Sequence, residues 1–335
     1  MVLFVQIARC RQEGRGMRKL EKTVHILNYI GSKARMSEAL SSIIPKDCNI
    51  YAELFCGSAA LALNSRSFDV KILNDANPHI ANFWAVATNP ETRANLLQRI
   101  QEIEYSKSLF EEAKQRKELH GAKRADKIDW AVDTFILNSQ SYNASGEYWV
   151  YRDAEKYKKN LTDIFGLPLA FKALEGQDFR VYNTNALDCM EQEHLLQNER
   201  AFIFLDPPYL EDLRSDTKLY EVDMPDVRDH IKLLKAIKNA KAKIVLSGYW
   251  SGRDDGSDLY DFYLLPNGWH RHLLGEYTKG CATASQKPKG LEWIWTSYAL
   301  EKETLLALEY LDVYCADRKS TRIRQWLSSE HGITA

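Results

Sequence analysis

The chain of 335 residues has no apolar run that approaches the roughly 18 to 20 residues of a transmembrane helix. No positive residue precedes the apolar stretch Val2 to Ala8, so we expect no secretory signal there. An excess of charge of one sign is also missing, because 45 Lys and Arg residues face 46 Asp and Glu residues. Any surface that binds nucleic acid must therefore be local, and we predict a cytoplasmic protein without a membrane segment.

Two patterns of chemistry-bearing residues are absent as well. The six cysteines lie far apart, with no Cys-x-x-Cys pair and no nearby His at metal-ligand spacing. This pattern predicts neither a disulfide framework nor a zinc site, and we expect reduced thiols and no metal. The three-glycine fingerprint of dinucleotide-binding proteins is also missing.

Short runs rich in Val, Ile, Leu, Phe and Tyr are present, and helical patterns lie between most of them. Such runs are typical of strands in a parallel sheet that is covered on both faces. The expected strands are 49–56, 70–73, 179–182, 201–205 and 243–247, and the expected helices are 59–65, 80–87 and 226–240. In the last helix we expect Val227, Ile231, Leu234 and Ile237 to form one apolar face. This alternation predicts a doubly wound, mostly parallel α/β fold.

Two regions depart from this alternation. Residues 269–277 and 291–298 are aromatic-rich and flank a Lys/Gly/Pro/Ser loop, which predicts a C-terminal β-hairpin. Residues 85–177 lack the strand pattern, which predicts an inserted, mostly helical subdomain. The main domain is then formed by residues 21–84 and 178–300. Residues 1–20 are expected to be a disordered tail or an upstream extension, with Met17 as an alternative start, and residues 301–335 a helical tail.

The most informative motif is Asp206-Pro207-Pro208-Tyr209, which follows a buried strand. Ligands of open α/β sheets bind at the carboxyl edge of the strands, where this motif is expected. The prolines stiffen the turn and have no N–H group, so the carbonyl of Pro207 stays available as an acceptor. The Asp206 carboxylate and this carbonyl can accept both hydrogens of one amino group, while the Tyr209 ring stacks on the plane that carries it. The motif thus fits an exocyclic amine on a base, and a rigid turn that caps the strand is the alternative.

A second candidate ligand site follows the first two strands. Gly57 and the small residues after it let the backbone approach a ligand where a helix begins. Asp75 lies 18 positions later, close to the roughly 20-residue separation at which an acidic residue meets a ribose hydroxyl. Asp75 is therefore a candidate ribose ligand, and an N-cap of the helix near Pro78 or a plain surface charge are the alternatives.

In chain order, several motifs resemble the Dam-like (alpha) group of adenine-specific DNA methyltransferases. They are Tyr29-Ile30-Gly31-Ser32-Lys33, Glu53 to Leu61, Asn74-Asp75 with Asn82-Phe83-Trp84, Asp206 to Tyr209, Leu246 to Tyr249, and Glu292 to Thr296. The resemblance spans residues 28–298 and implies the Rossmann-like fold of methyltransferases that use S-adenosylmethionine, without a metal. The product formed from this cofactor would be S-adenosylhomocysteine.

The resemblance also implies which residues contact the cofactor. Lys33 would pair with its carboxylate and Asp75 with its ribose. Asn185 and Ala186 align with an Asp and a bulky residue that contact the cofactor adenine in the family, so this chain departs from the pattern there. The full implied set is Tyr29, Lys33, Phe55, Gly57, Asp75, Asn185, Ala186 and Asp206, while Asp206, Pro207 and Tyr209 are the implied catalytic residues.

In this family the inserted segment is the target-recognition region, which implies that double-stranded DNA is the partner. Two short segments resemble the family's Tyr-Asn and Gly-x-Phe pattern, so Tyr142, Asn143, Gly146 and Tyr148 are the candidate DNA-binding residues. Scattered basic residues suit partial contact with phosphates better than a uniform basic stripe. They are Lys107, Lys114, Arg116, Lys117, Lys123, Arg124, Arg152, Lys156, Lys158, Lys159 and the lysines of the loop 279–289.

The implied reaction is methyl transfer to N6 of adenine in a specific DNA sequence, by base flipping and direct in-line attack. The implied enzyme is bacterial or phage-encoded, acts on the nucleoid as a monomer and has a cognate restriction endonuclease as a candidate partner. Cytosine amino methylation is an alternative, although that class usually begins the motif with Ser. RNA or protein-amide methylation more often has Asn at that position. A DNA-binding protein with decayed catalysis is the third alternative, and the intact Asp206 to Tyr209 motif and Lys33 argue against it.

Overall fold

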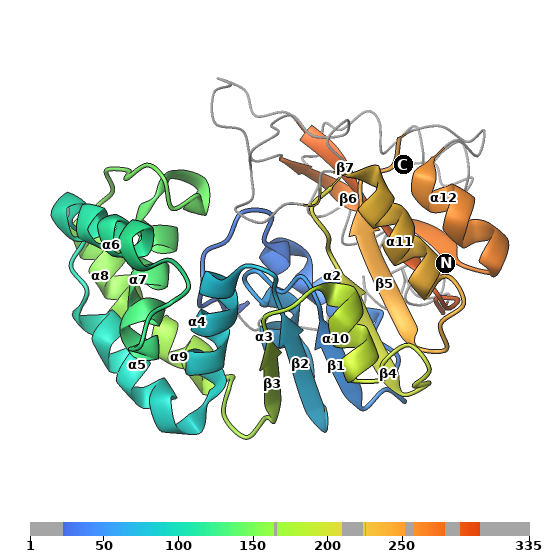
Figure 1. The fold of residues 1–335 in the computed structure, drawn as a ribbon, viewed down its shortest axis with the longest axis horizontal. Coiled ribbons are helices and arrows are strands. Elements are labelled where there is room, and N and C mark those ends of the chain that lie inside the picture. The colour runs from blue at the N-terminus through green and yellow to red at the C-terminus, as the bar shows by residue number, and fades with distance from the viewer. Residues whose placement is uncertain are drawn as a thin grey trace, which may run out of the picture.

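The computed structural model describes residues 23–163, 166–209, 224, 226–251, 258–278 and 289–301. A seven-stranded sheet in the order β3-β2-β1-β4-β5-β7-β6 forms its centre (Figure 1). Strands β1 (Ile50–Glu53), β2 (Val70–Asn74), β3 (Phe179–Tyr182), β4 (Ala201–Leu205) and β5 (Lys243–Gly248) are parallel. Strand β7 (Lys289–Thr296) runs antiparallel to both β5 and β6 (His270–Thr278). The predicted α/β fold and its C-terminal hairpin are confirmed.

The central strands are continuous apolar runs because both faces of the sheet are covered. Successive side chains of β4 alternate between two core clusters: Phe202 and Phe204 belong to one, and Ile203 and Leu205 to the other. The first cluster is covered by α2 (Ser37–Ser42), α3 (Ala60–Asn64) and α4 (Pro78–Thr88). The second is covered by α10 (Ala186–Gln192), α11 (Val227–Ile237) and α12 (Leu259–Leu264). The short helices η1 (Lys33–Met36) and η4 (Leu265–Asn267) precede α2 and follow α12.

The apolar face predicted for α11 was correct at Leu234 and Ile237, which are buried, and wrong at Val227. Val227 is 46% exposed, and the buried side chains are His230, Leu233, Leu234 and Ile237. The polar ring of His230 can be buried because it has two hydrogen-bond partners, the Tyr260 hydroxyl at 2.9 Å and the Met224 carbonyl at 3.1 Å. A polar residue whose hydrogen bonds are satisfied thus occupies part of the buried face, and the spacing of apolar residues does not predict it.

The segment between β2 and β3 is helical. After α4 it contains α5 (Pro90–Glu102), α6 (Lys107–His120), α7 (Lys127–Gln140), η2 (Tyr142–Ala144), α8 (Ala154–Thr162) and α9 (Leu167–Lys172). These elements lie beside the sheet, beyond α4 and β3 (Figure 1). A proline follows the capping Asn89, whose side-chain oxygen accepts from the Glu91 N–H at 2.9 Å, and this separates α5 from α4. The cores are continuous, since Phe135 of α7 stacks on Phe83 of α4 with ring centroids 6.4 Å apart.

Several predicted segments lie outside the described residues. They are the N-terminal extension, most of the lysine-bearing loop 279–289 and almost all of the predicted C-terminal helical tail. Within the described ranges, no helix is both long enough and apolar enough to cross a membrane.

Candidate functional site

A cavity of about 250 Å³ opens at the carboxyl ends of β1, β2 and β4. Strand β1 pairs with β2 on one side and with β4 on the other, so the chain order reverses at this point of the sheet. Such a switch point is where open α/β sheets bind their ligands. The cavity is lined by the whole set that the sequence assigned to a cofactor, namely Tyr29, Lys33, Phe55, Gly57, Asp75, Asn185, Ala186 and Asp206.

The turn after β1 brings the backbone of Gly57 to the cavity wall. Its N–H donates to Asp75 Oδ2 at 2.8 Å, and its carbonyl accepts from the Trp84 indole at 2.7 Å. The backbone φ angle of Gly57 is +42°, and an added Cβ would lie 2.5 Å from the ring of Tyr29. Only glycine fits, because any side chain would be strained in the backbone and would collide with Tyr29.

Asp75 is buried and faces the turn that it stabilises. Besides Gly57, it accepts a hydrogen bond from the N–H of Asn77 at 2.9 Å. Burial raises the pKa of Asp75 to about 6, although the two backbone donors oppose this shift. The cap of α4 is Asn77, whose side-chain oxygen accepts from the His79 N–H at 2.9 Å. Asp75 is therefore neither the helix cap nor an exposed charge, the two alternatives that its position in the sequence left open.

Lys33 joins the cavity to the motif after β4. Its side chain is 7% exposed, and its ammonium donates to Asp206 Oδ2 at 2.7 Å and to the Gly31 carbonyl at 3.3 Å. The preceding Ser32 caps η1 and shares a 2.7 Å hydrogen bond with the Ser58 hydroxyl. The Gly-Ser-Lys turn is thus fastened to the Gly57 turn, and Lys33 is not the solvated loop residue that its local sequence alone would suggest.

Asp206 and Tyr209 lie in the turn that leaves β4. Asp206 Oδ1 accepts from the Ser247 hydroxyl and lies 3.2 Å from the Tyr209 hydroxyl. The Tyr209 hydroxyl also donates to Glu292 Oε2, at 2.8 Å. The centroids of the Tyr209 and Tyr249 rings lie 4.4 Å apart, and the angle between the ring planes is 60°. The motif after β4 is therefore bound to the end of β5 and to the middle of β7.

Glu53 is a buried acid at the end of β1 to which sequence reasoning assigned no role. It lines the cavity, and its Oε2 accepts from the Tyr51 hydroxyl at 2.8 Å and from the Ala62 N–H at 3.0 Å. Burial raises the pKa of Glu53 to about 8, and burial likewise lowers the pKa of nearby Lys71 to about 8. A charged residue at the end of an otherwise apolar strand was the signal that could have drawn attention to Glu53.

The cavity also has lining residues to which the sequence assigned no role. Met224, Asp229, Lys232 and Leu233 bring part of the α11 region to the cavity. Asn185, in turn, is the N-cap of α10, and its Oδ1 accepts from the Leu187 N–H at 2.8 Å. The Asn in place of the family's Asp therefore has a local structural role.

The candidate DNA-binding residues lie on a closed loop that follows α7. A β-bridge joins Ser141 to Trp149, and the Tyr142 N–H donates to the Tyr148 carbonyl at 2.8 Å. Asn143 and Gly146 have positive φ angles of 50° and 72°, as a tight loop requires. Tyr142 is 37% and Tyr148 75% exposed. The loop thus presents two aromatic side chains to solvent.

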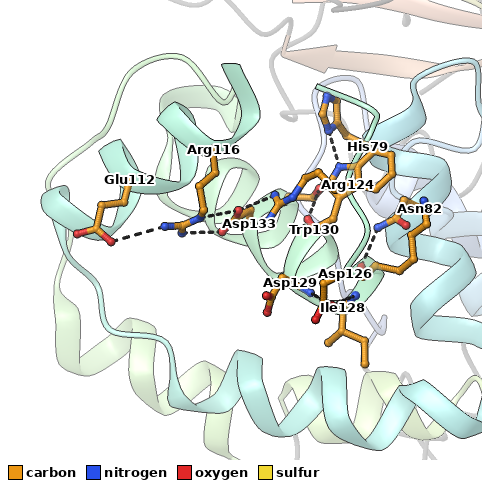
Figure 2. Close-up of polar contacts among 12 residues, drawn as sticks. His79, Asn82, Glu112, Arg116, Arg124, Asp126, Ile128, Asp129, Trp130 and Asp133 are labelled. Carbon is orange, nitrogen blue, oxygen red and sulfur yellow. Dashed lines mark hydrogen bonds and ion pairs between the residues drawn. The ribbon is translucent and has the colours of Figure 1, made fainter. Parts of the chain in front are cut away.

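Part of the predicted phosphate-contacting set has structural partners. Figure 2 shows Asp133 of α7 between two guanidinium groups, those of Arg116 and Arg124. Lys114 pairs with Glu147 at 3.0 Å, and Arg152 donates to the Ser139 and Ser141 carbonyls. The Arg124 side chain is only 9% exposed and pairs with Asp133, so little of it is open to a phosphate. The side chains of Lys107, Lys123, Lys156 and Lys159 are exposed.

The helical segment is joined to the main domain by specific contacts of α7 with α4. The Trp130 indole donates to His79 Nδ1 at 2.7 Å, and Asn82 donates its side-chain N–H to the Lys127 carbonyl at 3.0 Å (Figure 2). A tryptophan can only donate, so His79 Nδ1 carries no proton in this contact. The loop from Ser141 to Trp149 follows α7 directly, so its place relative to the cavity follows from this joint.

Comparison with known proteins identifies the family of this chain. Residues 29–271 match the family described as D12 class N6 adenine-specific DNA methyltransferase. The type II methyltransferase M.CviBI of Paramecium bursaria Chlorella virus NC1A is 23% identical over 257 residues, which cover 71% of this chain and 87% of that protein. The modification methylase StsI of Streptococcus sanguinis is 24% identical over 194 residues, which cover 55% of this chain and 28% of that protein. The chain belongs to the D12 class of N6 adenine-specific DNA methyltransferases.

Proposed function

We propose that this enzyme transfers a methyl group from S-adenosylmethionine to N6 of a flipped-out adenine in a specific double-stranded DNA sequence. The observation that carries the proposal is the 2.7 Å ion pair of Lys33 and Asp206 at the cavity that the candidate cofactor residues line. This pair brings the residue assigned to the cofactor and the residue assigned to the adenine amino group to one point.

The cavity residues fit the chemical groups of S-adenosylmethionine. Lys33 offers a cation for the carboxylate, and Asp75 offers carboxylate oxygens for a ribose hydroxyl. Phe55 and Ala186 supply apolar surface for the adenine ring. The turn at Gly57 leaves the space that a side chain would fill. Bound S-adenosylmethionine would supply an electrophilic methyl group carried by its sulfonium.

Asp206, Pro207 and Tyr209 would hold the target base. The Asp206 carboxylate and the Pro207 carbonyl accept the two amino hydrogens of adenine and keep the lone pair of the nitrogen directed at the methyl group. Flipping the base out of the duplex costs a few kcal/mol. Stacking on the Tyr209 ring offsets about 1 to 3 kcal/mol of this. Orientation of the two reactants can supply up to roughly 7 to 11 kcal/mol of rate acceleration.

The loop from Ser141 to Trp149 would bind the DNA, with Tyr142, Asn143, Gly146 and Tyr148 nearest to it. Its exposed tyrosines can stack or wedge between bases, and its backbone donors can bind phosphates. Lys107, Lys123, Lys156 and Lys159 are exposed cations on the helices and loops of the same segment.

We also propose that the enzyme acts as a monomer in the cytoplasm. A cognate restriction endonuclease is its proposed partner, since one relative is named a type II methyltransferase and the other a modification methylase.

The test is methyl transfer by purified Asp206→Ala. Transfer of labelled methyl from S-adenosylmethionine to duplex DNA should fall more than a thousandfold, while Asp47→Ala, which changes an exposed acid elsewhere, should match the wild type. Sequencing that detects modified bases should find N6-methyladenine in one sequence context. Wild-type transfer by Asp206→Ala, or label recovered in cytosine, would contradict the proposal. Calorimetry adds a second check, because a decayed DNA-binding protein would release no heat on mixing with S-adenosylmethionine.

A further inference from the structure

Glu292 is a buried carboxylate beside the proposed base platform. It lies on β7, opposite Gly275 of β6, where the register between the two strands shifts. Glu292 is only 7% exposed. A buried carboxylate is unfavourable unless it is hydrogen-bonded, and Oε2 of Glu292 accepts from the Tyr209 hydroxyl at 2.8 Å.

The Tyr209 hydroxyl has one hydrogen and two carboxylates nearby. Glu292 Oε2 lies at 2.8 Å, whereas Asp206 Oδ1 lies at 3.2 Å. The shorter contact takes the main share of the hydrogen bond. Asp206 Oδ1 has another donor in the Ser247 hydroxyl, and Oδ2 has the Lys33 ammonium. The far end of the Tyr209 ring is thus held by β7, while its backbone continues from β4.

This contact holds the far end of the ring and favours one ring plane, because a phenolic O–H lies in the plane of its ring and Glu292 accepts from it in one direction. The backbone of Tyr209 alone leaves the ring free to rotate about its side-chain bonds. With the hydroxyl held, the ring centroid lies 5.2 Å from the Lys33 ammonium and 4.4 Å from the Tyr249 centroid. A ring that serves as a stacking platform needs such a fixed plane, because a flipped base stacks only on a face that is correctly oriented.

We propose that Glu292 is a positioning residue that holds the Tyr209 ring in the plane on which the target adenine stacks. The inference rests on the proposed function, in which Tyr209 is the base platform. Glu292 acts through the Tyr209 hydroxyl and needs no contact with the base or with S-adenosylmethionine. An acceptor oxygen at this position is therefore sufficient, and a negative charge is not required.

The test combines four variants with two measurements. The variants are Glu292→Ala, Glu292→Gln, Tyr209→Phe and the double variant Glu292→Ala with Tyr209→Phe. The measurements are the single-turnover rate of methyl transfer and the fluorescence of 2-aminopurine placed at the target position of the DNA. Stacking on an aromatic ring quenches this fluorophore, so the signal reports whether a flipped base meets the ring.

Glu292→Ala should lower the single-turnover rate by about 10- to 100-fold, as expected for the loss of a hydrogen bond to a charged group. It should also brighten the aminopurine signal. Tyr209→Phe keeps the ring and loses the hydroxyl, so it should lose a similar factor. The double variant should be no slower than the slower single variant, because both changes remove the same contact. Glu292→Gln should keep most of the rate, because its amide oxygen can accept from the hydroxyl.

Glu193→Ala is the matched control. The Tyr182 hydroxyl donates to Glu193, so this change removes a second tyrosine–glutamate contact at the edge of the same sheet. Neither of these two residues lines the cavity. Glu193→Ala should keep the wild-type rate and the wild-type aminopurine signal. Thermal melting and S-adenosylmethionine calorimetry identify any variant that is not folded. If Glu292→Ala is unfolded, Tyr209→Phe and Glu292→Gln still give the comparison.

Two results would overturn the inference. A wild-type rate and signal in folded Glu292→Ala would show that the ring needs no such support. A loss in Glu292→Gln as large as that in Glu292→Ala would show that charge, and not an acceptor, is needed. Failure of the proposed function gives a different result. Full activity of Tyr209→Ala would show that Tyr209 is not the base platform, whatever the Glu292 variants do.

Discussion

The ammonium nitrogen of Lys33 lies 2.7 Å from Asp206 Oδ2, across 173 positions of the chain. The two side chains are 7% and 18% exposed, so solvent screens their attraction only in part. Ser247 donates to the other oxygen of Asp206. The proposed cofactor cation and the proposed acceptor of the adenine amine therefore form one electrostatic unit, and a change in either must affect the other.

Lys33→Met removes the ammonium and keeps an apolar side chain of similar length. We expect the dissociation constant of S-adenosylmethionine, measured by calorimetry, to rise on the order of 10- to 100-fold, since a hydrogen bond to a charged group contributes about 1.5 to 3 kcal/mol. Lys46→Met, which changes an exposed lysine, should have no effect. A dissociation constant close to that of the wild type in Lys33→Met would exclude Lys33 as a cofactor ligand.

Gly57→Ala should destabilise the protein and abolish S-adenosylmethionine binding. The added Cβ would lie 2.5 Å from the Tyr29 ring at a φ of +42°. Gly268→Ala is the control, because Gly268 also has a positive φ, of 81°, but has no atom within 4 Å of an added Cβ. The control should show only the backbone penalty of about 1 to 2 kcal/mol. Equal losses of melting temperature in both variants would contradict the predicted collision.

Glu53→Gln should change the pH dependence of stability. The folded-state pKa of Glu53 is about 8, above its ordinary value of 4.5, so its protonated form is favoured by folding. The resulting stability is fully present below about pH 4.5 and is lost as pH rises through about 8. Glutamine can accept the same two hydrogen bonds and does not titrate. Melting temperatures at several pH values should show the variant gaining on the wild type as pH rises.

Asp75 and Lys71 are buried groups that also titrate, and both remain in Glu53→Gln. The pKa of Asp75 is raised to about 6, so its contribution to the stability of the protein is lost as pH rises through that value. The pKa of Lys71 is lowered to about 8, so its contribution to the stability of the protein is lost as pH falls through that value. The contribution of Asp75 cancels in the difference between variant and wild type, which then reports Glu53 together with its electrostatic effect on Lys71. A difference that stays constant from acid to alkaline pH would refute the raised pKa.

Asp133→Ala should destabilise the helical segment by about 3 to 5 kcal/mol, because it leaves a buried guanidinium without its partner. The Asp133 side chain is 5% and that of Arg124 9% exposed. Asp129→Ala is the control on the same helix. Asp129 and its partner Arg99 are both 42% exposed, so this change should cost less than about 1 kcal/mol. Urea unfolding measures both, and equal free energies would contradict the distinction.

Tyr148→Ala should raise the KM for DNA about tenfold or more, as the loss of one base–aromatic stack would. Its melting temperature should not change, because the side chain is 75% exposed. Phe262→Ala, which removes another aromatic side chain that is 64% exposed but lies on α12, should leave the KM for DNA unchanged. Unaltered DNA binding in Tyr148→Ala would remove this residue from the interface.

The strands and the motifs that end them could be predicted because their signals are local. The predicted strand ranges 179–182 and 201–205 coincide with β3 and β4, since a short apolar run between turn residues suffices to identify a buried strand. The face of α11 was predicted correctly at Leu234 and Ile237 and wrongly at Val227, because periodicity counts apolar residues and His230 is buried through hydrogen bonds. Arg124 is likewise of a residue type that often contacts DNA phosphates. Only its hydrogen bond to Asp133 shows that it has a structural role in the helical segment.

The sequence by itself determined the α/β fold, the family and the motifs at the sheet edge, because each depends on residues close together in the chain. Only the tertiary structure decided that Lys33 meets Asp206, that Asp75 holds Gly57, and that Glu292 reaches Tyr209. These contacts join segments far apart in the chain, and their geometry depends on strand order, register and burial. A linear pattern specifies which groups are available, whereas packing around the sheet sets which of them come within hydrogen-bond distance.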